Sequence, residues 1–168
     1  MATAPDWAAQ MTAISTAVLA LGVLGAGIAA LFAGQQVREA RRSRQAQTAV
    51  EVFRRWNEDA LTETRRLISG FAGPGELATA FSGYVAGNAP EAYVLYRELD
   101  YFEQLAALER IGAIDPQMIE LLVGRTLPER WDMWEPALRA THGLDSYPLF
   151  RALAERLRAN GGRDGGGA

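Results

Sequence analysis

The residues that could carry catalysis are few, and their positions predict no active site. The only histidine, His142, lies in the stretch RATHGLD, just before a glycine at a predicted helix end. A histidine at a helix C-terminus interacts favourably with the helix dipole, so we expect no catalytic role for it. The chain has no cysteine, which excludes a disulfide, a thiol nucleophile and a cysteine-ligated metal.

Carboxylates and glycines do not complete a site either. Glu98, Asp100 and Glu103 lie close together in one predicted helix, but a carboxylate-bridged metal site would also need a Glu-x-x-His pair, which the sequence lacks. The stretch GFAGPGELATAFSG has no Lys-Ser/Thr of a phosphate-binding loop and follows a helix, not a strand. We therefore predict no catalytic residue, no metal and no cofactor, and interpret the carboxylates as a solvated face or as partners of arginines.

The charge balance argues against a nucleic-acid partner. After Arg44 the chain has 13 arginines against 18 aspartates and glutamates. A protein that binds DNA or RNA needs a basic surface to neutralise phosphates. We expect the partner to be a protein or a second copy of this chain.

An apolar N-terminal segment predicts a membrane anchor. No ionisable side chain occurs from Trp7 to Val37, and the stretch from Met11 to Ala33 is long enough to cross a bilayer as a helix. The sequence thus predicts a short extracytoplasmic N-terminus over residues 1–10 and a transmembrane helix over residues 11–34. A cleaved signal peptide is the alternative.

Arginines directly after this segment predict its orientation. By the positive-inside rule they place the remainder of the chain in the cytoplasm, and they are Arg38, Arg41, Arg42 and Arg44. The predicted localisation is therefore the inner or plasma membrane, as a single-pass protein with a cytoplasmic C-terminal domain.

Small residues recur along one side of the predicted membrane helix, opposite a bulky side. They are Gly22, Gly25, Ala26, Ala29, Ala30 and Ala33. Small residues let helix backbones approach closely in lipid, which predicts self-association or docking on a partner helix. An alanine-rich and glycine-rich composition would produce the same stripe by chance, so both explanations stay open.

A long helix is predicted over residues 35–70, because no proline or glycine occurs from residue 35 to residue 68. Seven of its residues are spaced alternately four and three apart, as in a coiled-coil seam: Ala46, Val50, Phe53, Asn57, Ala60, Thr64 and Leu67. This seam either pairs between two chains or packs on later helices of the same chain. The spacing alone leaves both arrangements open.

The remaining chain predicts a helical bundle and no sheet. A connection containing glycine and proline covers residues 71–89, and the bundle over residues 90–160 completes a domain with residues 45–70. Prolines open its helices near residues 90, 116, 128 and 148, and residues 161–168 are predicted to be disordered. The predicted fold class is all-α: an N-terminal transmembrane helix that continues into a long cytoplasmic helix packed with a small helical bundle.

Three stretches carry a resemblance to a known family: FRRWN, LDYFEQLAALERIGAID and ERWDMWEPAL. In this order the chain resembles an uncharacterised bacterial family of unknown function, whose members pair one transmembrane helix with a small helical cytoplasmic domain. The resemblance spans roughly residues 22–158 and implies no known activity. The residues that match the family's pattern are Trp56, Asn57, Phe102, Glu103, Gly112, Trp134 and Pro136.

Among these, Glu103 is the polar position of most interest. Buried beside Phe102, its carboxylate would need a partner such as Arg97 or Arg130 to offset its desolvation. The leading functional hypothesis is a non-enzymatic, membrane-anchored interaction or scaffold module at the cytoplasmic face. The alternatives are a membrane-tethered effector or defence module, and a membrane-tethered enzyme that uses arginines and carboxylates.

Overall fold

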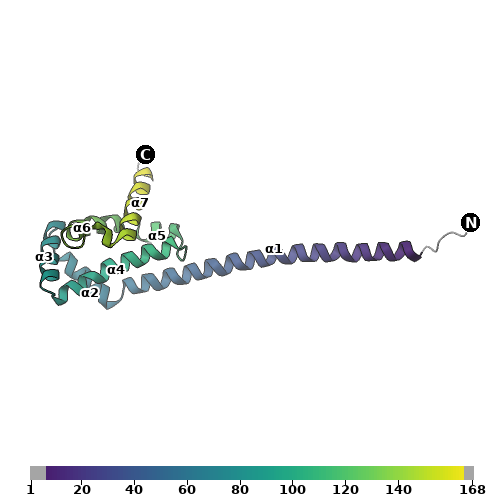
Figure 1. Ribbon diagram of the computed structural model, residues 1–168, viewed down its shortest axis with the longest axis horizontal. Coiled ribbons are helices and arrows are strands. Elements are labelled where there is room, and N and C mark those ends of the chain that lie inside the picture. Colours follow the sequence, from purple (N-terminus) through teal and green to yellow (C-terminus); the bar gives the residue numbers. More distant parts are fainter. Residues whose placement is uncertain (1–6, 165–168) are drawn as a thin grey trace, which may run out of the picture. The chain divides into compact units, whose positions relative to one another are not determined.

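The computed structural model describes the backbone of residues 7–164 and the side chains of Trp7, Met11 and residues 29–161. Its elements are seven α-helices and one short 3-10 helix (Figure 1): α1 Trp7–Trp56, α2 Asp59–Ser69, α3 Pro74–Ala86, α4 Pro90–Arg110, α5 Pro116–Val123, α6 Thr126–Thr141, the 3-10 helix Leu144–Ser146 and α7 Pro148–Asp164. No strand occurs between residues 7 and 164, so the all-α prediction is confirmed for this part of the chain.

The transmembrane prediction is not confirmed. Crossing a bilayer takes about 20 consecutive apolar residues in a helix, and within the described residues no helix meets that requirement. This finding contradicts the transmembrane helix predicted over residues 11–34, and with it the single-pass localisation that rested on this helix. The side chains of residues 12–28, in the middle of the predicted span, lie outside the described residues.

The chain divides into two compact units, residues 1–43 and residues 44–168, with the boundary inside α1. In the second unit, α4 packs against α2, α3 and α7, while α6 packs against α3 and α7. The helix α7 continues to Asp164, four residues beyond its predicted end. Residues 165–168, the end of the predicted disordered tail, lie outside the described residues.

Prolines begin four of the helices, as their fixed backbone angle and missing N–H favour. They are Pro74, Pro90, Pro116 and Pro148. Asp115 caps α5, because its Oδ1 accepts a hydrogen bond of 2.8 Å from the backbone N–H of Gln117. The starts that the sequence predicted for α4, α5 and α7 are therefore correct, whereas the start predicted at Pro128 is wrong, because α6 begins at Thr126.

The long helix predicted over residues 35–70 is interrupted. It ends at Trp56, and α2 begins at Asp59 after a turn at Asn57 and Glu58. The face that packs on the domain explains the break: its residues are spaced by three and four up to Trp56, and the next buried side chain, Leu61, comes five residues later. Five residues rotate a helix by about 140° relative to its start, so an unbroken helix would turn Leu61 away from the core.

Both helices follow α4 in the opposite chain direction. The Tyr101 hydroxyl of α4 donates a hydrogen bond of 3.3 Å to the carbonyl of Val52 in α1. Further along, the hydroxyl of the buried Thr64 in α2 donates one of 2.8 Å to the carbonyl of Val94. The turn after Trp56 therefore lets α1 and α2 pack on successive parts of the same helix.

A helix also occupies the segment predicted as a connection. Residues 71–89 contain several glycines, which suggested a bent loop, but α3 begins at Pro74 and continues to Ala86. Leu77 and Phe81 on its inner face are fully buried, and the ring centroid of Phe81 lies 5.4 Å from that of Trp134 in an edge-to-face contact. Burial of this apolar face outweighs the low helix propensity of glycine.

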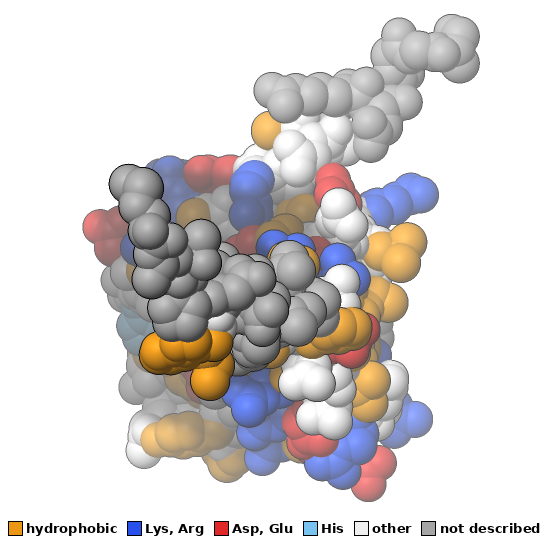
Figure 2. Space-filling view, turned by 90° about the vertical axis from the view of Figure 1, so that its right-hand side faces the viewer, with side chains coloured by type: hydrophobic (Ala, Val, Ile, Leu, Met, Phe, Trp, Pro, Cys, Tyr) orange, Lys and Arg blue, Asp and Glu red, His pale blue; other side chains and the backbone are white. Residues whose placement is uncertain are grey.

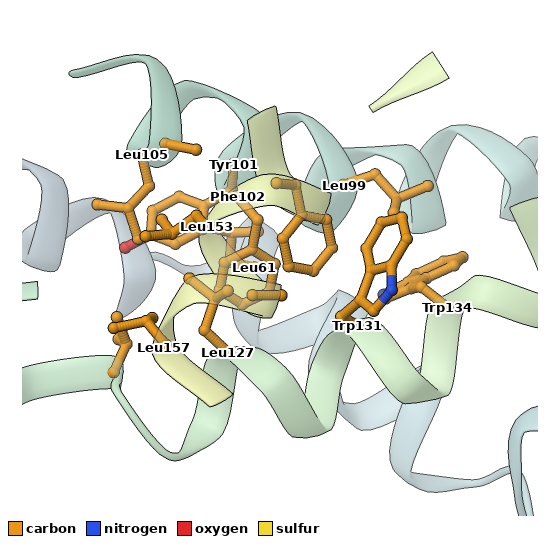
Figure 3. Close-up of a cluster of buried hydrophobic side chains, with 14 of the residues drawn as sticks. Leu61, Leu99, Tyr101, Phe102, Leu105, Leu127, Trp131, Trp134, Leu153 and Leu157 are labelled. Carbon is orange, nitrogen blue, oxygen red and sulfur yellow. The ribbon is translucent and has the colours of Figure 1, made fainter. Parts of the chain in front are cut away.

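Aromatic side chains form much of the core, as their size favours. Phe102 of α4 stacks on Phe150 of α7 with centroids 4.8 Å apart, and Trp131 of α6 meets Phe150 edge to face at 5.1 Å. Figure 3 shows side chains of α4, α6 and α7 meeting in this core, with Phe102, Leu99 and Trp131 among them. Trp56 lies at the half-buried edge of this core.

Candidate functional site

The end of α1 turns one face to the domain. Ala49 and Val52 of this face are buried, and Gln45 and Trp56 are half-buried. The Gln45 side chain donates a hydrogen bond of 2.9 Å to the carbonyl of Gly112. Trp56 lies with its ring centroid 5.0 Å from that of Tyr101. Residues 45, 49, 52 and 56 therefore fix α1 on α4.

On the neighbouring face of α1, one side chain, that of Phe53, packs against the core of the domain, while Ala46 and Val50 do not. Ala46 and Asn57 are exposed, Phe53 is half-buried, and the Val50 side chain, two residues before the buried Val52, is 68% exposed. These four residues, which we call the α1 seam, are the first half of the predicted seven-residue seam. Valine is among the residue types most often found inside proteins, so Val50 marks an apolar strip that the chain leaves uncovered.

The second half of the predicted seam follows the turn and belongs to α2. There Thr64 is fully buried and Leu67 half-buried, while Ala60 is exposed. Packing within the same chain is therefore correct for Thr64 and Leu67. It is also correct for Phe53, which packs against the core, whereas Ala46, Val50 and Asn57 stay exposed beside the contact residues 45, 49, 52 and 56.

Upstream of the seam, every side chain from Ala29 to Arg44 is exposed. This segment includes the four arginines on which the orientation was predicted, Arg38, Arg41, Arg42 and Arg44. It also includes Ala29, Ala30 and Ala33 of the small-residue stripe, whereas the side chains of Gly22, Gly25 and Ala26 lie outside the described residues. The stripe as a helix–helix interface stays a prediction.

Glu103 caps a helix. Its carboxylate accepts hydrogen bonds from the backbone N–H groups of Leu149, at 3.2 Å, and Phe150, at 2.8 Å. These are two of the free amides in the first turn of α7, where a negative charge is stabilised by the helix dipole. The partners suggested from the sequence, Arg97 and Arg130, are wrong: Arg97 pairs with Glu63 and Arg130 with Glu98.

Glu98 is the charged residue that the core encloses completely. Its side chain is 0% exposed, and Oε1 lies 3.4 Å both from Nε of Arg130 and from the indole Nε1 of Trp134. Oε2 is buried without a hydrogen-bond partner. Burial raises the pKa of Glu98, while Arg130, Trp134 and Arg65 act in the opposite direction. Of the two interpretations of this carboxylate, the solvated face is wrong and the pairing with an arginine is correct, although no local pattern indicated its complete burial.

Polar side chains also line a surface cavity of about 210 Å³ between α4 and the turn that joins α1 to α2. Arg55 donates a hydrogen bond of 3.3 Å to Gln104 across it, and Arg97 and Asp100 contribute further charges. Arginine and carboxylate side chains therefore both line this surface cavity. In the described part of the chain, no group of three or more histidine, cysteine, aspartate or glutamate residues could hold a metal ion.

His142 ends α6, as expected. Its Nε2 is hydrogen-bonded to the Tyr96 hydroxyl, and the two rings lie with centroids 5.6 Å apart. Desolvation raises the pKa of Tyr96. The pair joins α4 to the end of α6, next to Phe81 of α3.

The remaining family-pattern residues have structural positions. Gly112 follows α4 with a φ of 71°, a conformation that glycine adopts without strain, and its carbonyl accepts the bond from Gln45. Trp134 is fully buried, and Pro136 lies inside α6. On the face seen in Figure 2, arginine and acidic side chains are interspersed with hydrophobic ones.

The comparison with known families agrees with this reading of the pattern. The family described as Domain of unknown function (DUF4760) matches residues 17–157, and the chain therefore belongs to it. No curated protein and no solved structure is significantly similar to the chain. The predicted resemblance to a domain family of unknown function is confirmed.

Proposed function

We propose that this member of the DUF4760 family is a helical interaction module that associates with a second copy of itself through the α1 seam. One observation carries the proposal: Val50 and Ala46 stay exposed on a helix whose adjacent face is tightly packed. Ala49 and Val52, on either side of Val50 in sequence, are buried against the domain. The end of α1 is thus held on α4 by one face, while Ala46 and Val50 stay exposed to a partner helix.

The energetics support a helix as the partner. Burying a valine side chain completely stabilises an interface by about 1.5 to 3 kcal/mol. In a symmetric pair each seam residue is buried twice, once in each copy. Ala46 is small enough to let two helix axes come close, and a spacing of four residues keeps Ala46 and Val50 on one side of α1.

The exposed stretch before the seam supports the same proposal. From Ala29 to Arg44 no side chain is buried, and Leu31, Phe32 and Val37 are all more than half exposed. Helices in proteins are stabilised mainly by packing of an apolar face, because propensity alone is marginal in water. A helix of this length therefore gains stability from a partner outside its own chain.

Sedimentation velocity of the full chain over a range of concentrations tests the proposal. We expect the wild-type protein to form a dimer and Val50→Asp to shift it to a monomer. Thr62→Asp is the matched control, because it adds the same charge at an exposed helical position and keeps an acceptor for Arg65, which donates to the Thr62 hydroxyl at 2.9 Å. A wild-type chain that stays monomeric, or a Val50→Asp dimer as strong as the control, would contradict the proposal.

A further inference from the structure

We infer that the surface cavity between α4 and the turn after α1 binds a small zwitterion, a molecule with one carboxylate and one ammonium group such as a free α-amino acid. Its lining combines an apolar floor with charges of both signs. Leu61 and Tyr101 form the floor and are buried. The charged side chains are Arg55 of α1, Glu58 of the turn, and Arg97 and Asp100 of α4.

One face of α4 forms a wall of the cavity. Arg97, Asp100 and Gln104 follow one another at steps of three and four residues, which places them on the same side of the helix. Asp100 therefore lies about one helical turn from each of the other two. Arg55 reaches this wall from α1, since its Nη1 donates a hydrogen bond of 3.3 Å to the Gln104 side chain. A molecule bound at Asp100 thus lies near arginines from two helices.

The two arginines are available to an anionic group. Among the described side chains Arg55 forms no ion pair, and its partner Gln104 is a neutral amide. A carboxylate accepts two charge-assisted hydrogen bonds from the arginine fork and is a stronger partner than an amide. Arg97 lies 3.3 Å from Glu63, but the two side chains are 47% and 63% exposed, and exposed pairs contribute little stability. A ligand carboxylate can therefore replace either partner.

The two carboxylates are available to a positive group. Asp100 accepts a hydrogen bond of 3.2 Å at Oδ1 from the Tyr147 hydroxyl, which orients the carboxylate and leaves Oδ2 for a ligand. Glu58 is exposed in the turn and forms no ion pair within the described part of the chain. An ammonium group has three N–H donors, all suited to carboxylate oxygens.

The balance of charge selects the class of ligand. Two arginines and two carboxylates cancel, so the lining has no net charge. A phosphate or dicarboxylate would be repelled by Glu58 and Asp100, and a metal ion or polyamine by the arginines, whereas a zwitterion pairs with both signs. The volume of about 210 Å³ is below the roughly 300 to 1,000 Å³ of sites for drug-sized ligands, which limits the ligand to a small molecule.

Thermal unfolding of the full chain, followed by circular dichroism, tests the site with each standard α-amino acid added singly. A ligand that binds only the folded state raises the unfolding temperature as its concentration increases. We expect at least one amino acid to do so. Acetate and methylammonium, which each carry one of the two charges, should raise it less at equal ionic strength. No shift with any amino acid, or an equal shift with acetate or methylammonium, would overturn the inference.

Arginine variants locate the binding. Arg55→Gln should weaken binding of the active amino acid about tenfold or more, because hydrogen bonds between charged groups are lost. Arg54→Gln is the matched control, since this neighbouring arginine pairs with Glu51 at 2.7 Å and does not line the cavity. Arg97→Gln gives the same reading from α4 if Arg55→Gln fails to fold. Equal binding by the cavity variant and the control would show a general solvent effect, and the inference would be wrong.

Asp100→Asn tests the other charge. The amide removes the negative charge but keeps an oxygen that can accept the hydrogen bond from the Tyr147 hydroxyl, so the fold should be retained. We expect weaker binding of the amino acid and no weaker binding of acetate. If the amino acid binds this variant as tightly as the wild type, its ammonium group is not recognised by Asp100 and the assignment of a zwitterion fails.

Discussion

Glu103 caps α7, and its contacts determine how much stability the protein should lose when this side chain is removed. Glu103→Ala removes a carboxylate that accepts hydrogen bonds from the backbone N–H groups of Leu149 and Phe150. Hydrogen bonds to charged groups contribute about 1.5 to 3 kcal/mol each, and loss of a helix N-cap costs about 0.5 to 2 kcal/mol. Because α7 can fray and its amides can then meet water, we expect a loss of about 2 kcal/mol in the free energy of unfolding.

Glu103→Gln separates the charge from the shape of the side chain. The amide keeps one oxygen acceptor and so can satisfy one of the two N–H groups, but it loses the charge that the helix dipole stabilises. We expect about half of the loss seen for alanine, or roughly 1 kcal/mol. Glutamine should therefore lie between the wild type and the alanine variant.

Urea unfolding followed by far-UV circular dichroism measures both variants. Gln104→Ala is the matched control: it changes the next residue of α4, which is exposed and bonded only to Arg55 at 3.3 Å, and should cost less than about 0.5 kcal/mol. If Glu103→Ala destabilises the protein no more than Gln104→Ala, the two bonds do not hold α7 and the reasoning is refuted.

Three further predictions concern the core and its helix ends. Burial raises the pKa of Glu98 above its ordinary value of 4.5. The folded protein therefore binds the proton of the Glu98 carboxyl more tightly than the unfolded chain does. The stability that this protonation contributes is complete below pH 4.5 and is lost as pH rises through the pKa of the folded state. Stability of the wild type should therefore fall relative to Glu98→Gln between pH 4.5 and neutrality, and unfolding curves with the same pH dependence would contradict this. Phe81→Ala should cost about 3 to 5 kcal/mol in urea unfolding, because the fully buried ring leaves a cavity between α3 and α6, and a loss below about 1 kcal/mol would show that α3 is not part of the core. Asp115→Ala should cost about 0.5 to 2 kcal/mol by loss of the α5 cap, whereas Asp115→Asn should retain most of the stability.

Local signals in the sequence predicted the helix starts well. A proline at the first position of a helix acts within one turn, so the starts at Pro90, Pro116 and Pro148 could be identified without the fold. The segment of α3 could not, because its glycines lower helix propensity locally, and the compensating burial of Phe81 comes from α6, more than 40 residues away. The capping role of Glu103 is likewise a contact between distant segments.

The long apolar segment shows a different limit. Hydropathy over residues 11–34 and the arginines after it predicted a transmembrane helix, and the described helices offer none that is long and apolar enough. Spacing and composition identify a helix there correctly, since α1 covers residues 7–56. The residue types of one chain indicate where a helix forms, but they do not specify what the outer side of that helix contacts.

The α1 seam shows why periodicity alone could not choose its partner. Residues 45, 49, 52 and 56 and residues 46, 50, 53 and 57 have the same steps of four, three and four, and the two faces lie about 100° apart on one helix. The domain packs on the first set because Trp56 can reach Tyr101 and Phe102 of α4 and Gln45 can bond to Gly112. In the second set Phe53 also packs against the core, while Ala46 and Val50 stay exposed. These two residues are therefore where a partner helix would gain most, and they make this part of α1 a candidate binding surface.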